Sequence, residues 1–285
     1  MRSRAVVAFV SLLAVLLVAV ALGLRPGPAT GAPSSAQRVR LTVMVPCGLA
    51  GPYGELKKQF AAKRPDIELH QRVDNTFVMA KEVVNGKDTA DVMLCLGNRE
   101  AEYLANHGKV TGRPVRFARN AVAILVQKGN PKGIKTVQDL ARPEVKQIGV
   151  ATGEVNSLGF YAEQACQRAK IWDKIKGKCW RPDEPVEIGT AVAQGKLDAG
   201  LIYATCMKET RTVGGKPTPR KKSEGAARVD QKLYDLIYCS GVKLAGCKNV
   251  KAADDFLAFV ARPEHAALWT EWGFDPLGKP AGPRK

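Results

Sequence analysis

The apolar residues Leu41, Val43 and Val45 alternate with Thr42 and Met44, and this pattern predicts a buried β-strand near the beginning of the fold. Turn-forming residues at 46–52 end the strand, and the segment up to residue 60 is predicted to be helical. A strand that passes through a small-residue loop into a helix leaves backbone N–H groups unpaired, and the helix dipole favours an anion there. We therefore expect a ligand at this loop, in which Cys47 is unusual because such loops normally carry Gly, Ser or Thr.

The same alternation of strand and helix continues along the chain. Further strands are predicted at 66–73, 90–96, 121–127, 147–151, 199–203 and 236–244. Further helices are predicted at 75–85, 100–107, 136–140, 158–170, 188–195, 252–261 and 264–272. This order is typical of an α/β fold with parallel, doubly wound sheets.

The late strand at 236–244 indicates two lobes joined by two hinge crossings, near 120–127 and 236–243. We assign 33–39 to a linker, 40–119 and 237–285 to lobe 1, and 120–236 to lobe 2. Each lobe is expected to contain a mostly parallel sheet with flanking helices. A ligand cleft is then expected between the carboxyl ends of the two sheets.

The first 32 residues have the pattern of a secretory signal peptide. Arg2 and Arg4 precede an apolar run at 5–24, and small residues follow up to Ala32, where cleavage is expected. The alternative is a retained membrane anchor, because about 20 apolar residues suffice to span a bilayer. Both alternatives place the rest of the chain in the periplasm or an equivalent extracytoplasmic compartment.

The chain of 285 residues is strongly basic, with a formal net charge of +17. A positive field attracts nucleic acid, anionic surfaces or anionic ligands. Nucleic-acid binding is not expected, because only 6% of the residues are aromatic and most basic residues are scattered. The basic cluster at 211–228 is rich in Gly, Pro and Lys, so we interpret it as a solvated surface loop.

Several segments resemble the periplasmic molybdate-binding protein family. They are 41–60, VVNGKDTADVMLC at 83–95, RFARNAVAILVQKGNPKGIKTVQDLARPEV at 116–145, LGFYAEQA at 158–165, LDAGLIYAT at 197–205 and FVARPEHAALWTEWGF at 259–274. The resemblance implies a two-lobed type II periplasmic binding fold. It also implies capture of a small oxyanion such as molybdate or tungstate in the interlobe cleft, and delivery to an ABC transporter permease.

The resemblance also carries ligand-binding positions onto loops at the predicted cleft. These positions are Cys47, Gly48, Asn75, Thr76, Cys95, Asn156, Ser157 and Tyr203. Thr76, Ser157 and Tyr203 keep hydroxyl donors of the kind that the family uses. We expect a monomer without a cofactor. We do not expect an enzyme, because the sequence has no Ser-His-Asp order, phosphate loop or paired-carboxylate site.

Seven cysteines in an exported chain first suggest disulfides, for which Cys166 with Cys179 and Cys47 with Cys95 are candidate pairs. The alternative is a cluster of thiolates at the cleft. Thiolates select soft acceptors, so such a cluster would bind a soft metal ion or a metalloid in place of an oxyanion. The cysteines of this alternative site are Cys47, Cys95, Cys206 and Cys239.

Overall fold

The computed structural model describes residues 38–154, 156–207 and 222–278. The predicted signal segment and most of the basic cluster therefore lie outside the described residues. Among the described residues, no helix combines the length and the apolar character that crossing a membrane requires.

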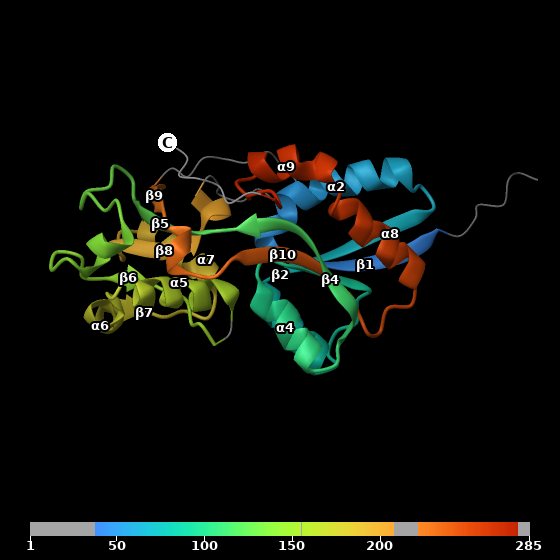
Figure 1. The fold of residues 1–285 in the computed structure, drawn as a ribbon, viewed down its shortest axis with the longest axis horizontal. Coiled ribbons are helices and arrows are strands. Elements are labelled where there is room, and N and C mark those ends of the chain that lie inside the picture. Colours follow the sequence, from blue (N-terminus) through green and yellow to red (C-terminus); the bar gives the residue numbers. More distant parts are fainter. Residues whose placement is uncertain (1–37, 155, 208–221, 279–285) are drawn as a thin grey trace, which may run out of the picture. The chain divides into compact units, whose positions relative to one another are not determined.

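The first sheet has the strand order β2-β1-β3-β10-β4. Its strands are β1 (Val39–Pro46), β2 (Ile67–Asp74), β3 (Val92–Cys95), β4 (Val110–Asn120) and β10 (Ile237–Leu244). β1 pairs in parallel with β2 and β3, whereas β10 pairs antiparallel with β3 and β4. The helices around it are α2 (Ala50–Lys63), α3 (Thr76–Val84), α4 (Asn98–Asn106), α8 (Val250–Val260) and α9 (Ala266–Glu271). Figure 1 shows α2 and α8 on one side of this sheet and α4 on the other.

The second sheet has the strand order β7-β6-β8-β5-β9. Its strands are β5 (Val122–Gln127), β6 (Ile148–Gly149), β7 (Cys179–Trp180), β8 (Ala199–Tyr203) and β9 (Ser223–Arg228). β6 is parallel to β7 and β8, and β5 is antiparallel to β8 and β9. Its helices are α5 (Ser157–Arg168), α6 (Trp172–Ile175) and α7 (Pro185–Ala193). Short 3-10 helices are η1 (Cys47–Leu49), η2 (Val137–Ala141), η3 (Lys176–Lys178), η4 (Ala204–Met207), η5 (Gln231–Leu233) and η6 (Pro263–His265).

The α/β architecture with two sheets is confirmed, but each sheet is mixed, because β5 and β10 run against their neighbours. Three strands were not predicted: β4, β7 and β9. β4 carries its buried residues only at its end and contains Pro114, so it lacks a clear alternating pattern. β9 pairs with β5 where a loop was predicted. The prediction missed it because small residues such as Gly225 have low strand propensity.

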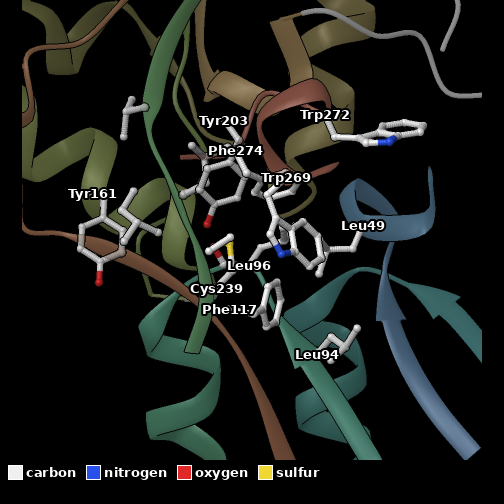
Figure 2. Packing of buried hydrophobic residues seen from close by; sticks show 14 of the residues in the cluster. Leu49, Leu94, Leu96, Phe117, Tyr161, Tyr203, Cys239, Trp269, Trp272 and Phe274 are labelled. Atoms are coloured by element: carbon white, nitrogen blue, oxygen red, sulfur yellow. The ribbon is translucent and has the colours of Figure 1, made fainter. Parts of the chain in front are cut away.

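A large hydrophobic cluster contains buried residues of both sheets. The Trp269 ring stacks on Phe117 of β4, with a centroid distance of 4.8 Å, and meets Phe274 edge-on at 5.6 Å. Figure 2 shows these three aromatic rings together with Tyr203 at the end of β8. Aromatic rings bury large apolar areas, so this cluster stabilises the region where the chain passes between the sheets.

Candidate functional site

A cavity of about 1070 Å³ lies at the ends of strands from both sheets. Cys47 follows β1, Asn75 follows β2, Leu96 follows β3 and Tyr203 ends β8, and all four residues line the cavity. Ligand sites of open α/β sheets lie at the carboxyl ends of the strands. The cavity is therefore the candidate functional site.

The N-terminal ends of four helices line this cavity. Gly51 belongs to the first turn of α2, Thr76 begins α3, Asn156 precedes α5 and Pro185 begins α7. Each helix N-terminus carries a partial positive charge and N–H groups without an intrahelical acceptor. Four such ends around one cavity favour negatively charged or electron-rich ligand atoms.

Asparagine side chains determine where two of these helices begin. The Asn75 side-chain oxygen accepts hydrogen bonds from the N–H groups of Phe77 and Val78, at 2.9 and 3.3 Å. The Asn156 oxygen accepts one from Gly159 N–H at 2.7 Å. Both asparagines line the cavity, but their oxygen atoms are used to cap helices.

The start of α2 differs from these two capped helices. No side chain among the described residues caps η1 or α2. Gly48 lies in η1 and lines the cavity beside Leu96, which a Cβ atom on Gly48 would approach to 3.1 Å. This stretch places backbone donors at the cavity wall with little side-chain cover.

Two buried hydroxyl groups line the cavity without a hydrogen-bond partner among the described residues. Tyr203 is 7% exposed and Thr205, in η4, is 3% exposed. Burial raises the pKa of Tyr203 well above its usual value, so the phenol stays protonated and can donate a hydrogen bond. Buried polar groups are normally paired, so these two hydroxyls indicate a place for a ligand or for water.

The carboxylate of Glu100 also lines the cavity, although only 2% of the residue is exposed. Its Oε1 atom accepts a hydrogen bond from Ser157 N–H at 2.9 Å, and Ser157 Oγ donates to Oε2. Burial raises the pKa of Glu100, while the hydrogen bonds from Ser157 oppose that rise. Ser157 thus faces the Glu100 carboxylate in this structure.

Gly97 makes this contact between α4 and α5 possible. A Cβ atom on Gly97 would overlap Cβ and Oγ of Ser157. Arg99 N–H also donates to Ser157 Oγ, at 3.2 Å. The start of α4 therefore lies directly against the start of α5.

The charged side chains that line the cavity are mostly acidic: Asp74, Glu100, Glu184 and Lys222. Glu184 is exposed and Asp74 is partly exposed. Asp74 also accepts a hydrogen bond from Asn75 N–H at 2.7 Å. The positive ends of the helix dipoles, more than side-chain cations, therefore supply the attraction for an anion.

The structure does not bring the four cleft cysteines together. Cys47 and Cys206 line the cavity, whereas Cys95 and Cys239 are buried in different clusters. Cys95 is paired with Ser240 across the β3–β10 ladder, so the neighbouring Cys239 points to the opposite face of the sheet. Within 38–154, 156–207 and 222–278, no three His, Cys, Asp or Glu residues are grouped to hold a metal ion.

The two candidate disulfides are also absent. Cys95, Cys166 and Cys179 are thiols, so the predicted Cys166–Cys179 and Cys47–Cys95 bridges are wrong. Cys166 is packed in the core, while Cys179 Sγ donates to the Ile175 carbonyl at 3.2 Å. Burial raises the pKa of Cys166 to about 12 and that of Cys179 to about 11, which keeps both protonated.

Sequence reasoning missed Glu100 and Thr205 as cavity residues. A signal for Glu100 is present in the helical period, because Glu100 and the buried Leu104 are four residues apart and share one face of α4. A carboxylate on the buried face of a helix needs a partner. That partner, Ser157, is 57 residues away in the sequence.

The chain matches the sequence profile of the bacterial extracellular solute-binding protein family over residues 41–275. It is 25% identical to the molybdate-binding protein ModA of Mycobacterium tuberculosis over 188 residues, which are 63% of this chain and 64% of that protein. The match thus spans just under two thirds of the relative's length.

Solved structures of binding proteins share the fold. The periplasmic molybdate-binding protein of Azotobacter vinelandii superimposes with a TM-score of 0.66 at 16% identity, covering 82% of this chain and 98% of that one. The sulfate-binding protein SubI of Mycobacterium tuberculosis gives a TM-score of 0.68 at 17% identity, covering 84% and 88%. These similarities confirm the two-lobed type II periplasmic binding fold. The chain belongs to the bacterial extracellular solute-binding protein family.

Proposed function

We propose that the chain is the extracytoplasmic solute-binding protein of an ABC transporter and captures a small oxyanion, such as molybdate or tungstate, in the cavity. The observation that carries this proposal is the convergence of four helix N-termini on a cavity that also contains the hydroxyls of Tyr203 and Thr205, which have no hydrogen-bond partner in the described part of the chain. The similarity to ModA supports the choice of oxyanion. The membrane partner is then an ABC permease, and the protein acts as a monomer without a cofactor.

Neutral hydrogen-bond donors are suited to binding an oxyanion. A tetrahedral oxyanion has only acceptor atoms, so it binds N–H and O–H groups that already point into the site. The uncapped start of η1 and α2, near Gly48, supplies backbone donors from one side. Tyr203 and Thr205 supply hydroxyl donors from β8 and η4. The helix dipoles, more than side-chain cations, stabilise the charge.

The cavity is larger than one oxyanion. Its volume of about 1070 Å³ corresponds to on the order of 30 water molecules. We propose that the lobe formed by 40–119 and 237–285 closes on the lobe formed by 120–236 when ligand binds. A hinge closure of this kind is driven by the higher affinity of the closed state for the ligand.

Isothermal titration calorimetry of the purified chain tests this proposal. The protein, fully reduced, is titrated with molybdate, tungstate and sulfate, and then with Cu(I) and Zn(II). Saturable binding of one oxyanion per chain is the expected result. Binding of a soft metal without binding of any oxyanion would contradict the proposal and favour the thiolate alternative at Cys47 and Cys206, which both line the cavity.

A further inference from the structure

Glu100 holds the N-terminus of a helix that packs on the other sheet. It belongs to α4, which packs against β3, β4 and β10 of the first sheet, whereas Ser157 begins α5, which packs against β5 and β8. Both carboxylate oxygens are engaged, one by Ser157 N–H and one by Ser157 Oγ–H. The carboxylate thus contacts α5 where a bound anion is expected to do so.

Two of the first donors of α5 are therefore already in use. Ser157 N–H binds Glu100, and Gly159 N–H binds the side-chain oxygen of Asn156. Ser157 is buried and does not line the cavity, whereas Glu100 does, so an oxyanion must displace the Glu100 carboxylate to reach Ser157. Two negative groups that share a buried site are unfavourable, and one of them is relieved by taking up a proton.

We propose that Glu100 is an internal anion that makes oxyanion binding proton-coupled. The ligand takes over the Ser157 donors, Glu100 takes up one proton from solvent, and the protonated carboxyl group then donates a hydrogen bond to the ligand. This inference rests on the proposed function. It adds that the cavity binds the oxyanion when Glu100 is protonated. The hydroxyls of Tyr203 and Thr205, to which no other residue in the described ranges is hydrogen-bonded, mark the neighbouring part of the cavity as the place of the ligand.

Several charged or titratable groups face Glu100 from the elements packed against it. They are Arg99 on α4, Ser157 and Tyr161 on α5, Tyr203 on β8, Cys95 on β3 and Cys239 on β10. Burial raises the pKa of each of these phenols and thiols, so they stay neutral. Arg99 is the cation among these groups, and its guanidinium stacks on the Phe160 ring at 4.3 Å.

The direction of the coupling follows from the hydrogen bonds. In the ligand-free protein, burial raises the pKa of Glu100 and the Ser157 donors partly offset this rise. A ligand that takes these donors removes the offset, and its own negative charge raises the pKa further. The pKa of Glu100 is thus higher in the complex, and ligand binding is accompanied by proton uptake.

The first experiment uses the unmodified protein. Calorimetric titrations with molybdate and tungstate are repeated in buffers of different ionisation enthalpy, from mildly acidic to mildly alkaline pH. Uptake of up to about one proton per bound dianion is expected, and affinity should fall by up to about tenfold per unit rise in pH. An affinity that is independent of pH, with no proton uptake, would overturn the inference and leave the proposed function intact.

The second experiment compares two carboxylate-to-amide variants on the same helix. Glu100→Gln should bind the dianion about tenfold or more tightly at mildly alkaline pH and should lose the pH dependence, because no carboxylate competes for Ser157. Glu102→Gln is the matched control, since Glu102 is exposed on α4 and does not line the cavity. It should keep the affinity and the proton uptake of the unmodified protein.

The outcomes separate the inference from the function on which it rests. Weaker or unchanged binding by Glu100→Gln, or an equal effect of Glu102→Gln, would contradict the role of Glu100 while oxyanion binding stands. If neither the unmodified protein nor Glu100→Gln binds any oxyanion, the proposed function fails and the inference fails with it. If Glu100→Gln does not fold, the buffer series on the unmodified protein still tests whether oxyanion binding is accompanied by proton uptake.

Discussion

The hydroxyl of Tyr203 is buried at the cavity wall and has no hydrogen-bond partner among the described residues. A buried hydroxyl without a partner contributes little to stability, because it loses its bonds to water and gains none within the protein. Figure 2 shows this hydroxyl on the side of the ring where Cys239 lies. The most direct use of such a group is to bind a ligand.

Replacing Tyr203 with Phe should therefore separate binding from stability. The free energy of unfolding is expected to change by less than about 1 kcal/mol, while oxyanion affinity falls about tenfold or more through the lost hydrogen bond to a charged group. Urea denaturation and calorimetric titration measure the two quantities.

Tyr234→Phe is the matched control for this prediction. The Tyr234 hydroxyl accepts a hydrogen bond from Val122 N–H at 3.0 Å and does not line the cavity. This variant should lose about 1–3 kcal/mol of stability and keep its affinity. A Tyr203→Phe protein with unchanged affinity would exclude Tyr203 from the binding site.

Gly97 offers a second test at the residue scale. Its φ of −154° is an extended conformation that alanine also adopts, so Gly97→Ala acts through the overlap with Ser157 and the close approach to Glu100 Oε2, at 3.3 Å. The expected loss of unfolding free energy is about 1–3 kcal/mol. Gly54→Ala in α2, where a Cβ atom meets nothing within 4 Å, should instead gain about 0.5–1 kcal/mol. Equal changes in the two variants would contradict the close contact at Ser157.

At the scale of single elements, the helices around the cavity are held by different means. α3 and α5 begin with an asparagine whose side-chain oxygen caps the first turn. α7 begins with Pro185, which has no N–H to satisfy. The starts of α2 and α4 show neither device among the described residues. Capping thus fixes where α3 and α5 begin and leaves the donors near Gly48 for a ligand.

The Asn156→Ala variant should show how much the α5 cap contributes. The loss of the bond to Gly159 N–H is expected to lower the unfolding free energy by about 1 kcal/mol, and Asn156→Ser should restore part of it. Asn249→Ala at the start of α8 is the control, because the Asn249 side chain does not cap its helix. Equal losses at both positions would show that the cap is not the cause.

At the scale of the whole chain, the segment near the carboxyl end forms hydrogen bonds with strands of both sheets. Asp275 forms a backbone bridge with Arg119 of β4, with N···O distances of 2.7 and 2.9 Å. Its carboxylate also accepts two hydrogen bonds from Arg228 of β9, both at 2.9 Å. A tie at the point where the chain passes between the sheets can limit how they move against each other.

Asp275→Asn should weaken the interaction with Arg228. The asparagine cannot hold the Arg228 guanidinium with two charge-assisted bonds, so a loss of about 1–2 kcal/mol in unfolding free energy is expected. Asp173→Asn removes an exposed partner of Lys176 and should change stability by less than about 0.5 kcal/mol. Urea denaturation of both variants measures the difference, and an equally small change in Asp275→Asn would show that the tie does not stabilise the fold.

The order of strands and helices could be predicted well because it depends on local patterns. The alternation at Leu41 to Val45 predicts β1, and Asn75 and Thr76 mark the start of α3 at the correct position. β4 and β9 were missed because their pairing depends on partners far along the chain and not on their own residues. The sequence also predicted Gly48, Thr76 and Tyr203 at the cleft, where they line the cavity.

The sequence by itself determined the α/β fold and the loops that form the cavity, since apolar periodicity and capping residues act within a few positions. Only the tertiary structure decided which side chains meet there. The ladder between β3 and β10 separates Cys95 from Cys239, because paired and neighbouring residues point to opposite faces of a sheet. The packing of α4 against α5 places Glu100 on Ser157, a contact between distant residues that no local pattern specifies.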